Sequence, residues 1–383
     1  MRWLSEPLEV DSDFPGGNII VDKITRNQID LRPDLRDSGE SCFYYYFRLH
    51  GAAGHTLRFT FPRGDVIGVR GPAVSVDGGL TWRWLGAQAV EVNSFTFNMP
   101  ASLPEVRFSC GMPYLQYNLE QFLSPYLGMY PRLPYLRKEV LCNSRQGRPV
   151  ELLHLGALAG IAPYQILLTC RHHSCEMMAN YALEGILQTV LGNSDAGKWL
   201  RQNAAFCVLP FMDKDGVEEG DQGKHRRPHD HHVDYGGIPL YPEVRALKHR
   251  LPQWMGGKLD VFLDLHCPGI KGEYNEFVYF VGEPEPELWE KVTEFSTILE
   301  ANLQGAIPYL RSHNLPYGER WNVAPEGGLN SSTGWVKTLE GEKLVSTLEI
   351  PYADASGVEV NPDSARLLGV DIATALAIYL QKK

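Results

Sequence analysis

The sequence predicts an α/β chain in two parts: a small antiparallel β-sandwich over residues 1–125 and an α/β domain over residues 126–383. From residue 18 to about residue 111, short alternating apolar runs recur roughly every ten residues between Gly, Pro and Asp, which is typical of a β-sandwich. Later in the chain, apolar strand-like runs alternate with helical ones, which is typical of an α/β domain. Between the two, residues 115–137 contain three prolines and no steady period, which places the boundary there.

The individual elements follow from local patterns. In the first part the predicted strands are FYYYFRL, TLRFTF, AVSV, TWRWL, SFTFNM and EVRFSC. In the second part, unbroken apolar runs predict buried strands in YQILLTC, AAFCVLPF, LDVFLDL and LVSTLEI. Helices are predicted in MANYALEGILQTVL and PELWEKVTEFSTILEANL. The last helix follows the cap residue Asn361, has Pro362 in its first turn and runs to near Gln381.

The composition excludes several classes of protein. With 44% hydrophobic and 21% charged residues, the 383-residue chain has the composition of a globular protein. A net charge of −10 argues against nucleic acid or an anionic membrane as the partner. No run approaches ~18 apolar residues and the start, MRWLSEPLEV, lacks an export signal, so we expect no membrane span. The seven scattered cysteines form no Cys-x-x-Cys pair, which fits free thiols in a reducing cytoplasm.

Four residues form a candidate zinc site. His173 and Glu176 lie in LLTCRHHSCEMMANYALEGIL, His266 lies in VFLDLHCPG, and Glu349 lies in VSTLEIPYA. Two imidazoles and one carboxylate can hold Zn²⁺ through three ligands and leave a fourth position for water, which is the pattern of catalytic zinc. A second carboxylate nearby can then act as the general base. Each candidate lies at or just past the end of an apolar strand, where sites of α/β sheets assemble.

Local spacing leaves some choices open. His172 is four residues before Glu176 and His173 is three, so either could join the carboxylate at a helix start. Cys175 and Cys267 are adjacent to the candidate ligands and are expected to be small buried residues. A group of four histidines is expected to form a polar rim of the cleft, with a second metal site as the alternative; they are His225, His229, His231 and His232.

The motifs H-S-C-E, L-D-L-H and T-L-E-I-P-Y-A resemble those of the zinc carboxypeptidase family. The segment LPFMDKDGVEEGDQGKHRRPHDHHVDYG resembles the N-P-D-G-V…G-N-Y-R…D-L-N-R region of its cytosolic carboxypeptidase branch, and the predicted sandwich resembles the amino-terminal domain of that branch. The resemblance covers residues of about 135–360 and, more weakly, the first part. It implies a mixed-sheet zinc carboxypeptidase-like catalytic domain with one zinc per chain. The implied ligands are His173, Glu176 and His266, and the implied general base is Glu349.

The chain departs from this family in its substrate-binding positions. Asp230-His231-His232-Val233 stands where the family has Asp-Leu-Asn-Arg, and Val233 cannot grip a substrate carboxylate. The resemblance leaves His232 and Lys224 as substrate-binding candidates and Tyr317 as the candidate for the family's substrate-capping tyrosine. Arg226 or Arg227 is the candidate for the family's arginine that stabilises the developing oxyanion, and the sequence does not choose between them.

These observations predict a zinc-dependent metallocarboxypeptidase that cleaves a C-terminal peptide or amide bond. One alternative is a zinc amidase or deacylase of small N-acyl amino acids, similar to aspartoacylase and succinylglutamate desuccinylase. The other is a degenerate protein that keeps the fold as a binding module, for which Val233 is the best support. The expected partner is a peptide or small amide substrate, and the sequence does not indicate an oligomeric state.

Overall fold

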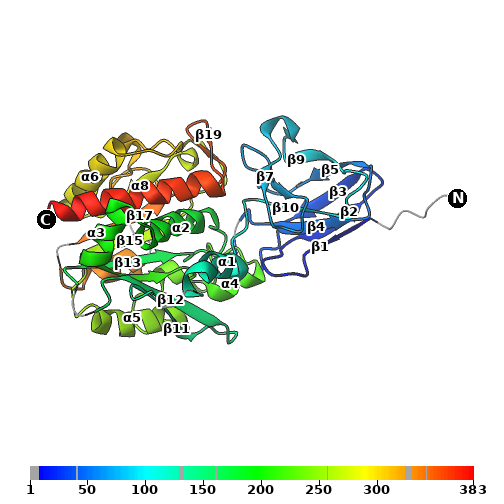
Figure 1. Cartoon of the computed structure of the whole chain (residues 1–383). Helices are drawn as coiled ribbons and strands as arrows, with labels where there is room; N and C mark the ends of the chain where they lie inside the picture. The colour runs from blue at the N-terminus through cyan, green and yellow to red at the C-terminus, as the bar shows by residue number, and fades with distance from the viewer. Residues whose placement is uncertain are drawn as a thin grey trace.

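The structure is a computed structural model that describes residues 8–39, 42–128, 133–159, 162–256, 258–323, 330–341 and 343–383. The described chain forms two parts that lie side by side, a β-sandwich and a larger α/β part (Figure 1). The predicted architecture is confirmed: a mixed-sheet α/β part follows antiparallel sheets. The boundary at residues 125/126 stays a prediction. No described helix is both long enough and apolar enough to cross a bilayer.

The first part packs two five-stranded sheets against each other, in the orders β1-β4-β10-β6-β7 and β2-β3-β5-β9-β8. Rings from both sheets meet in the core: Phe47 and Phe108 from one sheet contact Phe59 from the other. The pairing is antiparallel except between β3 and β5, which run parallel. The strands are β1 Glu9–Asp11, β2 Ile20–Ile24, β3 Gln28–Arg32, β4 Tyr46–His50, β5 Thr56–Thr60, β6 Ala73–Ser75, β7 Arg83–Trp84, β8 Val90–Glu91, β9 Ser94–Asn98 and β10 Glu105–Ser109.

The second part is built on a seven-stranded mixed sheet in the order β11-β12-β14-β13-β15-β17-β16. The four strands β14, β13, β15 and β17 run parallel, while β11, β12 and β16 are antiparallel to their neighbours. The parallel strands are buried almost throughout, which explains their unbroken apolar runs. The strands are β11 Leu136–Asn143, β12 Pro149–Gly156, β13 Tyr164–Cys170, β14 Ala204–Leu209, β15 Val261–His266, β16 Tyr279–Val281 and β17 Leu344–Glu349, followed by the small hairpin β18 Asp354–Ala355 and β19 Val358–Glu359.

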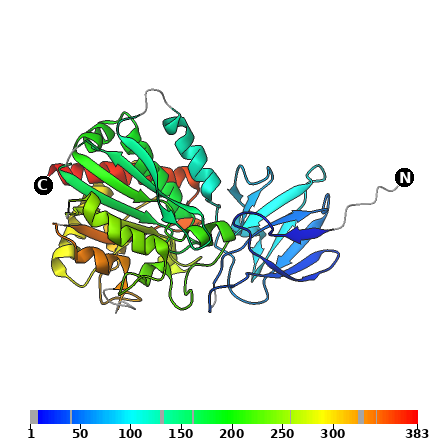
Figure 2. The same cartoon turned by 90° about the horizontal axis from the view of Figure 1, so that it is seen from below.

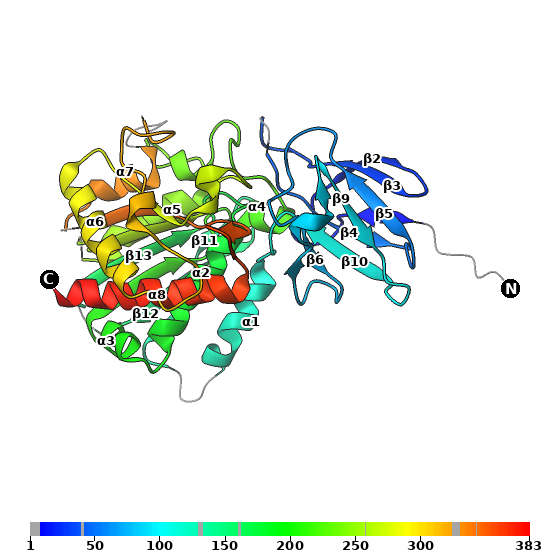
Figure 3. The same cartoon turned by 90° about the horizontal axis from the view of Figure 1, so that it is seen from above.

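Helices cover both faces of this sheet (Figures 1 and 2). Four of them, α2, α3, α6 and α8, pack together on one face, while α5 and α7 pack on the other. The long α8 begins on the side of the sandwich and runs across the sheet away from it, to the C-terminus, as Figure 3 shows from above. The helices are α1 Gln116–Leu127, α2 Met178–Leu191, α3 Asp195–Asn203, α4 Lys214–Glu219, α5 Pro242–Trp254, α6 Pro286–Ala301, α7 Ser332–Lys337 and α8 Pro362–Gln381.

Most predicted elements of the second part have their expected bounds. The strand at Tyr164–Cys170 and the helix at Met178–Leu191 match the predicted segments, and Asn361 caps α8 by accepting hydrogen bonds from two backbone amides. Helix α1 was not predicted, because the prolines of residues 115–137 suggested an irregular linker. It forms despite Pro125 in its interior, and it buries Leu119 and Leu123.

Candidate active site

The parallel strands deliver the candidate residues to one edge of the sheet. β15 ends at His266 and β17 ends at Glu349, and these two residues are directly paired in the ladder. His173 follows the end of β13, the neighbour of β15 on its other side. Because paired residues of adjacent strands project their side chains to the same face, the register sets His266 and Glu349 side by side.

Three candidate ligands converge at this edge. The Nδ1 atom of His173 lies 2.9 Å from Glu176 Oε1, and the Nδ1 atom of His266 lies 2.8 Å from Glu176 Oε2. One donor atom from each of the three residues lies within 4.8 Å of the other two. The structure therefore gathers two imidazole nitrogens and a carboxylate around one small volume.

This set of atoms fits a zinc ion. Two neutral imidazoles and a carboxylate are a usual ligand set for catalytic zinc. Within the described residues, Glu349 Oε2 is buried and has no hydrogen-bond partner. A buried carboxylate oxygen without a partner is costly, and a cation at this position would remove that cost.

Outer carboxylates orient both candidate histidine ligands. His266 Nε2 lies 3.1 Å from Asp264 Oδ2, and His173 Nε2 lies 3.6 Å from Asp230 Oδ2. Asp264 is itself held by hydroxyl groups, because Thr169 and Ser332 each donate a hydrogen bond of 2.8 Å to it. A carboxylate behind a ligating imidazole fixes its orientation and its tautomer.

His172 also belongs to a cluster that could hold a metal, with Asp264 and His266. Both of its ring nitrogens already have protein partners, however: Nδ1 lies 2.8 Å from Asp264 Oδ1 and Nε2 lies 2.8 Å from the Tyr235 hydroxyl. Burial lowers the pKa of His172. This arrangement favours His173 as the ligand and gives His172 a supporting position behind Asp264.

Lys224 is the cation that reaches the cluster. Its Nζ lies 2.8 Å from Glu176 Oε1 and donates to the carbonyl oxygen of Cys267 at 2.8 Å. Burial alone would lower the pKa of Lys224, but the Glu176 carboxylate outweighs that effect and raises it. Burial raises the pKa of Glu349, which lies in the same cluster. The site therefore holds a charged ammonium group beside two buried carboxylates.

The structure does not bring Arg226 or Arg227 to the cluster. The guanidinium of Arg226 binds the carboxylates of Asp37, Asp213 and Asp221. Arg227 is exposed and lies against Gly39. Neither arginine has a polar contact with Glu176, His266 or Glu349 among the contacts that the described chain makes.

The remaining candidates lie at different depths. His232 is half-buried against the rings of His172, His173 and His266, and its pKa falls to about 3, first through desolvation and then through the His266 charge. Tyr317 is 39% exposed on the loop that follows the 3₁₀ helix Arg311–His313.

The histidines of residues 225–232 do not form a second metal site within the described chain. His229 binds Asp234, His231 stacks on Tyr241, and His225 is exposed. The thiols at positions 175 and 267 contact the Tyr352 hydroxyl and the Glu176 carbonyl oxygen, respectively, and belong to no metal-binding group.

Two features of the site were not found by sequence reasoning. Asp264 was overlooked, although it lies two residues before His266 on a strand and so projects from the same face. Tyr279 of β16 is paired with Glu349 and lies on its other side from His266. The signal for both was the period of two within a strand, which the search for isolated ligands did not use.

A groove of about 510 Å³ opens beside the cluster. Asp230 links the two, because it lines the groove and also faces His173. Val233, which replaces the family's arginine, and Arg227 line the same groove. The cluster is therefore adjacent to a space that can receive a substrate.

Residues 119–267 match the family model described as zinc carboxypeptidase. The matched residues include His173, Glu176 and His266, and Glu349 follows them. This segment of the chain matches the zinc carboxypeptidase family.

Relatives and solved structures agree with this assignment. The chain is 23% identical to cytosolic carboxypeptidase 3 of Bos taurus over 314 residues, which covers 72% of this chain and 30% of the relative. It is 22% identical to cytosolic carboxypeptidase 6 of Caenorhabditis elegans over 300 residues, covering 71% of this chain and 64% of the relative. The chain therefore spans less than a third of the length of the first of these relatives.

The fold is similar to that of solved bacterial enzymes over almost the whole chain. A metallo-carboxypeptidase from Burkholderia cenocepacia superposes with a TM-score of 0.82 at 20% identity, covering 98% of this chain and 100% of that chain. A metallo-carboxypeptidase from Pseudomonas aeruginosa, in complex with (2-guanidinoethylmercapto)succinic acid, gives a TM-score of 0.79 at 21% identity, with coverage of 98% and 99%. Both likenesses include the sandwich as well as the zinc carboxypeptidase domain.

Proposed function

We propose that this protein is a zinc metallocarboxypeptidase that removes a C-terminal residue from a peptide. The convergence of His173, Glu176 and His266 beside Glu349, at one edge of a sheet with the zinc carboxypeptidase fold, carries the proposal. One zinc ion per chain, held by these three residues, supplies Lewis-acid polarisation of the scissile carbonyl and acidifies the attacking water.

Side chains of the protein carry out the proton transfers and orient the ligands. Glu349 accepts a proton from water as the water oxygen forms a bond to the carbonyl carbon. The same proton then passes from Glu349 to the leaving nitrogen as the carbon–nitrogen bond breaks. Asp230 and Asp264 keep the imidazoles of His173 and His266 in their ligating orientation.

Lys224 takes the role that the sequence gave to Arg226 or Arg227. Its ammonium group lies at the cluster, where negative charge develops on the carbonyl oxygen during attack. Each guanidinium nitrogen of Arg226 already contacts a carboxylate, so the side chain is committed to these ion pairs rather than to a substrate. Arg227 lines the groove, and there we assign it to the substrate's carboxylate instead.

A zinc amidase acting on small N-acyl amino acids is the second candidate. Val233 favours it, because the sequence resemblance places valine at the position where the family has the arginine that grips a peptide's terminal carboxylate. The cytoplasmic location stays part of the proposal. It is supported by six free thiols, which are Cys110, Cys142, Cys170, Cys175, Cys207 and Cys267, and by similarity to proteins named cytosolic.

Metal analysis followed by substrate screening tests the proposal. We expect about one zinc per chain after reconstitution, lost in His173→Ala and retained in the matched variant His172→Ala. Peptides that differ in their last residue are then compared with their C-terminal amides and with N-acyl amino acids. Cleavage of free-acid peptides alone supports a carboxypeptidase, and cleavage of N-acyl amino acids alone supports the amidase. Full zinc content in His173→Ala would contradict the ligand set.

A further inference from the structure

The loop of residues 220–230 brings two groups to the metal cluster. It connects α4 to the short 3₁₀ helix His231–Val233 and has no regular secondary structure of its own. From it, Lys224 reaches Glu176 and Asp230 faces His173. The position of this loop therefore sets the position of both side chains.

Much of the support for this loop comes from the first part of the chain. The Ser38 hydroxyl donates to the carbonyl oxygen of Lys224 at 2.5 Å, and Ser38 also forms a backbone bridge with Arg226. Further contacts come from the sandwich and its connecting loops. Asn18 Nδ2 donates a hydrogen bond to Gly220 O at 2.7 Å, and Arg227 N donates one to Asp37 O at 3.2 Å. Tyr44 and Gln222 exchange two hydrogen bonds: Tyr44 N donates to Gln222 Oε1 at 2.8 Å, and Gln222 Nε2 donates to Tyr44 O at 2.9 Å.

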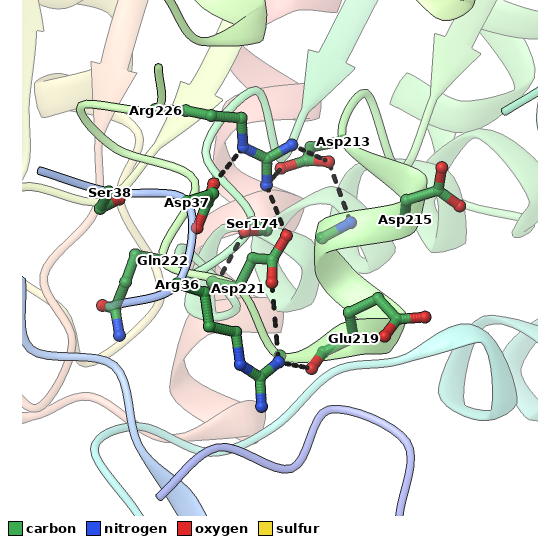
Figure 4. Close-up of polar contacts among 12 residues, drawn as sticks. Arg36, Asp37, Ser38, Ser174, Asp213, Asp215, Glu219, Asp221, Gln222 and Arg226 are labelled. Carbon is green, nitrogen blue, oxygen red and sulfur yellow. Dashed lines mark hydrogen bonds and ion pairs between the residues drawn. The ribbon is translucent and has the colours of Figure 1, made fainter. Parts of the chain in front are cut away.

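Arg226 is the centre of this contact. Figure 4 shows its guanidinium between the carboxylates of Asp37, Asp213 and Asp221. Its Nη2 lies 2.7 Å from Asp213 Oδ2 and 3.0 Å from Asp221 Oδ2, and its Nε binds Asp37 Oδ2. The Arg226 side chain is only 9% exposed. It thus joins three segments: the first part through Asp37, the start of α4 through its cap residue Asp213, and its own loop through Asp221.

The role that this ion cluster fits is to hold the loop in place rather than to contact the substrate. All of the guanidinium nitrogens face carboxylates, and the carboxylates come from both parts of the protein. Removing one partner of a buried ion pair leaves the other charge uncompensated, so the cluster resists displacement of the loop. Arg36 adds a second cation from the first part at Asp221, at 3.6 Å.

We infer that Asp37, acting through Arg226, is a positioning residue of the active site, and that the β-sandwich holds loop 220–230 so that Lys224 and Asp230 face the metal cluster. The first part of the chain is then a component of the catalytic centre. The effect on turnover rests on the proposed function, whereas the effect on the loop does not.

The test compares Asp37→Asn with Arg70→Gln in the zinc-loaded, full-length protein. Arg70 also joins the two parts through an ion pair, 2.6 Å from Asp354, but within the described chain it makes no hydrogen bond or ion pair with loop 220–230 and serves as a matched control. Hydrogen–deuterium exchange over residues 221–227 is expected to accelerate about tenfold in Asp37→Asn and to stay at the wild-type rate in Arg70→Gln. Ser38→Ala, which removes the hydrogen bond to Lys224 O, is the second variant and is expected to act in the same direction.

Kinetics separate positioning from general stability. On a cleaved peptide, Asp37→Asn is expected to lower kcat by about 10- to 100-fold with little change in KM, because a displaced loop misplaces Lys224. Asp37→Glu, which keeps the charge, should recover part of kcat. Unchanged loop exchange in both Asp37→Asn and Ser38→Ala, or equal exchange and equal loss of kcat in Arg70→Gln, would overturn the inference. Faster loop exchange in a protein that cleaves no peptide would uphold it while the proposed function fails.

Discussion

The two parts of the molecule bury different kinds of side chain. The sandwich core contains stacked aromatic rings, such as Phe59 and Phe95 with ring centroids 4.7 Å apart. The edge of the α/β sheet buries ionisable groups instead, among them Glu176, Asp264 and Glu349. Burying aromatic surface stabilises a fold, whereas burying charge destabilises it unless a partner compensates. The comparison indicates that the sandwich core stabilises the fold, whereas the sheet edge lowers the free energy of unfolding because it buries the charged groups that the reaction needs.

The largest effect on turnover is expected from Glu349→Gln, which changes a buried carboxylate at the sheet edge. We expect turnover to fall by about 10²- to 10⁴-fold, because the amide cannot accept the water proton. The free energy of unfolding should stay equal or rise, because the variant removes a buried ionisable group. Peptide kinetics, zinc content and urea unfolding measure these effects. Wild-type turnover in this variant would show that Glu349 is not the base.

Phe108→Ala tests the core of the sandwich. Phe108 is fully buried and contacts Phe47, Phe59, Phe95 and Phe97. Its removal should lower the free energy of unfolding by about 3–5 kcal/mol. The kcat of the protein that remains folded should change little. Urea unfolding followed by near-ultraviolet circular dichroism measures the loss, and a loss below about 1 kcal/mol would break the comparison.

Lys224→Met separates charge from packing at the sheet edge. The substitution keeps most of the side-chain volume and removes the ammonium group beside Glu176. We expect kcat to fall by about 10²- to 10³-fold, which is the usual effect of losing one donor to a developing oxyanion. Arg227→Met is the control, and we expect it to raise KM more than it lowers kcat. The reverse pattern in the two variants would return the oxyanion role to Arg227.

Ser332→Ala tests the support behind the metal ligands. Its hydroxyl donates to Asp264, so the variant leaves a buried carboxylate oxygen with one donor fewer. We expect a loss of about 1–3 kcal/mol of unfolding free energy. Zinc affinity should fall by about tenfold, because Asp264 orients His266. Ser346→Ala is the control: its buried hydroxyl bonds to Val281 O, so stability should fall without a change in zinc affinity.

The smallest expected effect is a pH dependence of the Arg226 cluster. Burial, followed by the charge of Asp37, raises the pKa of Asp221 from its ordinary 3.8 to about 7. A raised pKa in the folded state contributes stability at low pH, and that contribution is lost as the pH rises toward 7. Asp221→Asn, which cannot ionise, should therefore gain about 1 kcal/mol relative to the wild type between pH 6 and pH 7. Urea unfolding at both pH values measures the difference, and a constant difference would contradict the shift.

The sequence predicted what local pattern determines. Unbroken apolar runs located β13 and α2, and the ends of the strands located His266 and Glu349. It gave the oxyanion role to Arg226 or Arg227 and only substrate binding to Lys224, because the placement of Arg226 depends on Asp37, a residue far away in the chain that binds it. Helix α1 was not predicted, because Pro125 lowers the helix propensity of its segment. The helix forms because packing of its buried residues Leu119 and Leu123 stabilises it, and that packing is not visible in the local sequence.

The pairing of His266 with Glu349 has a consequence for redesign. The distance between a metal ligand and the base is a property of two neighbouring strands, so the backbone hydrogen bonds of the sheet fix it. Deleting one residue within either strand would turn the following side chains to the opposite face and separate the pair. Insertions between β15 and β16 would leave the pair intact. This part of the protein should therefore accept new surface loops, and with them new substrates, without any adjustment of its catalytic spacing.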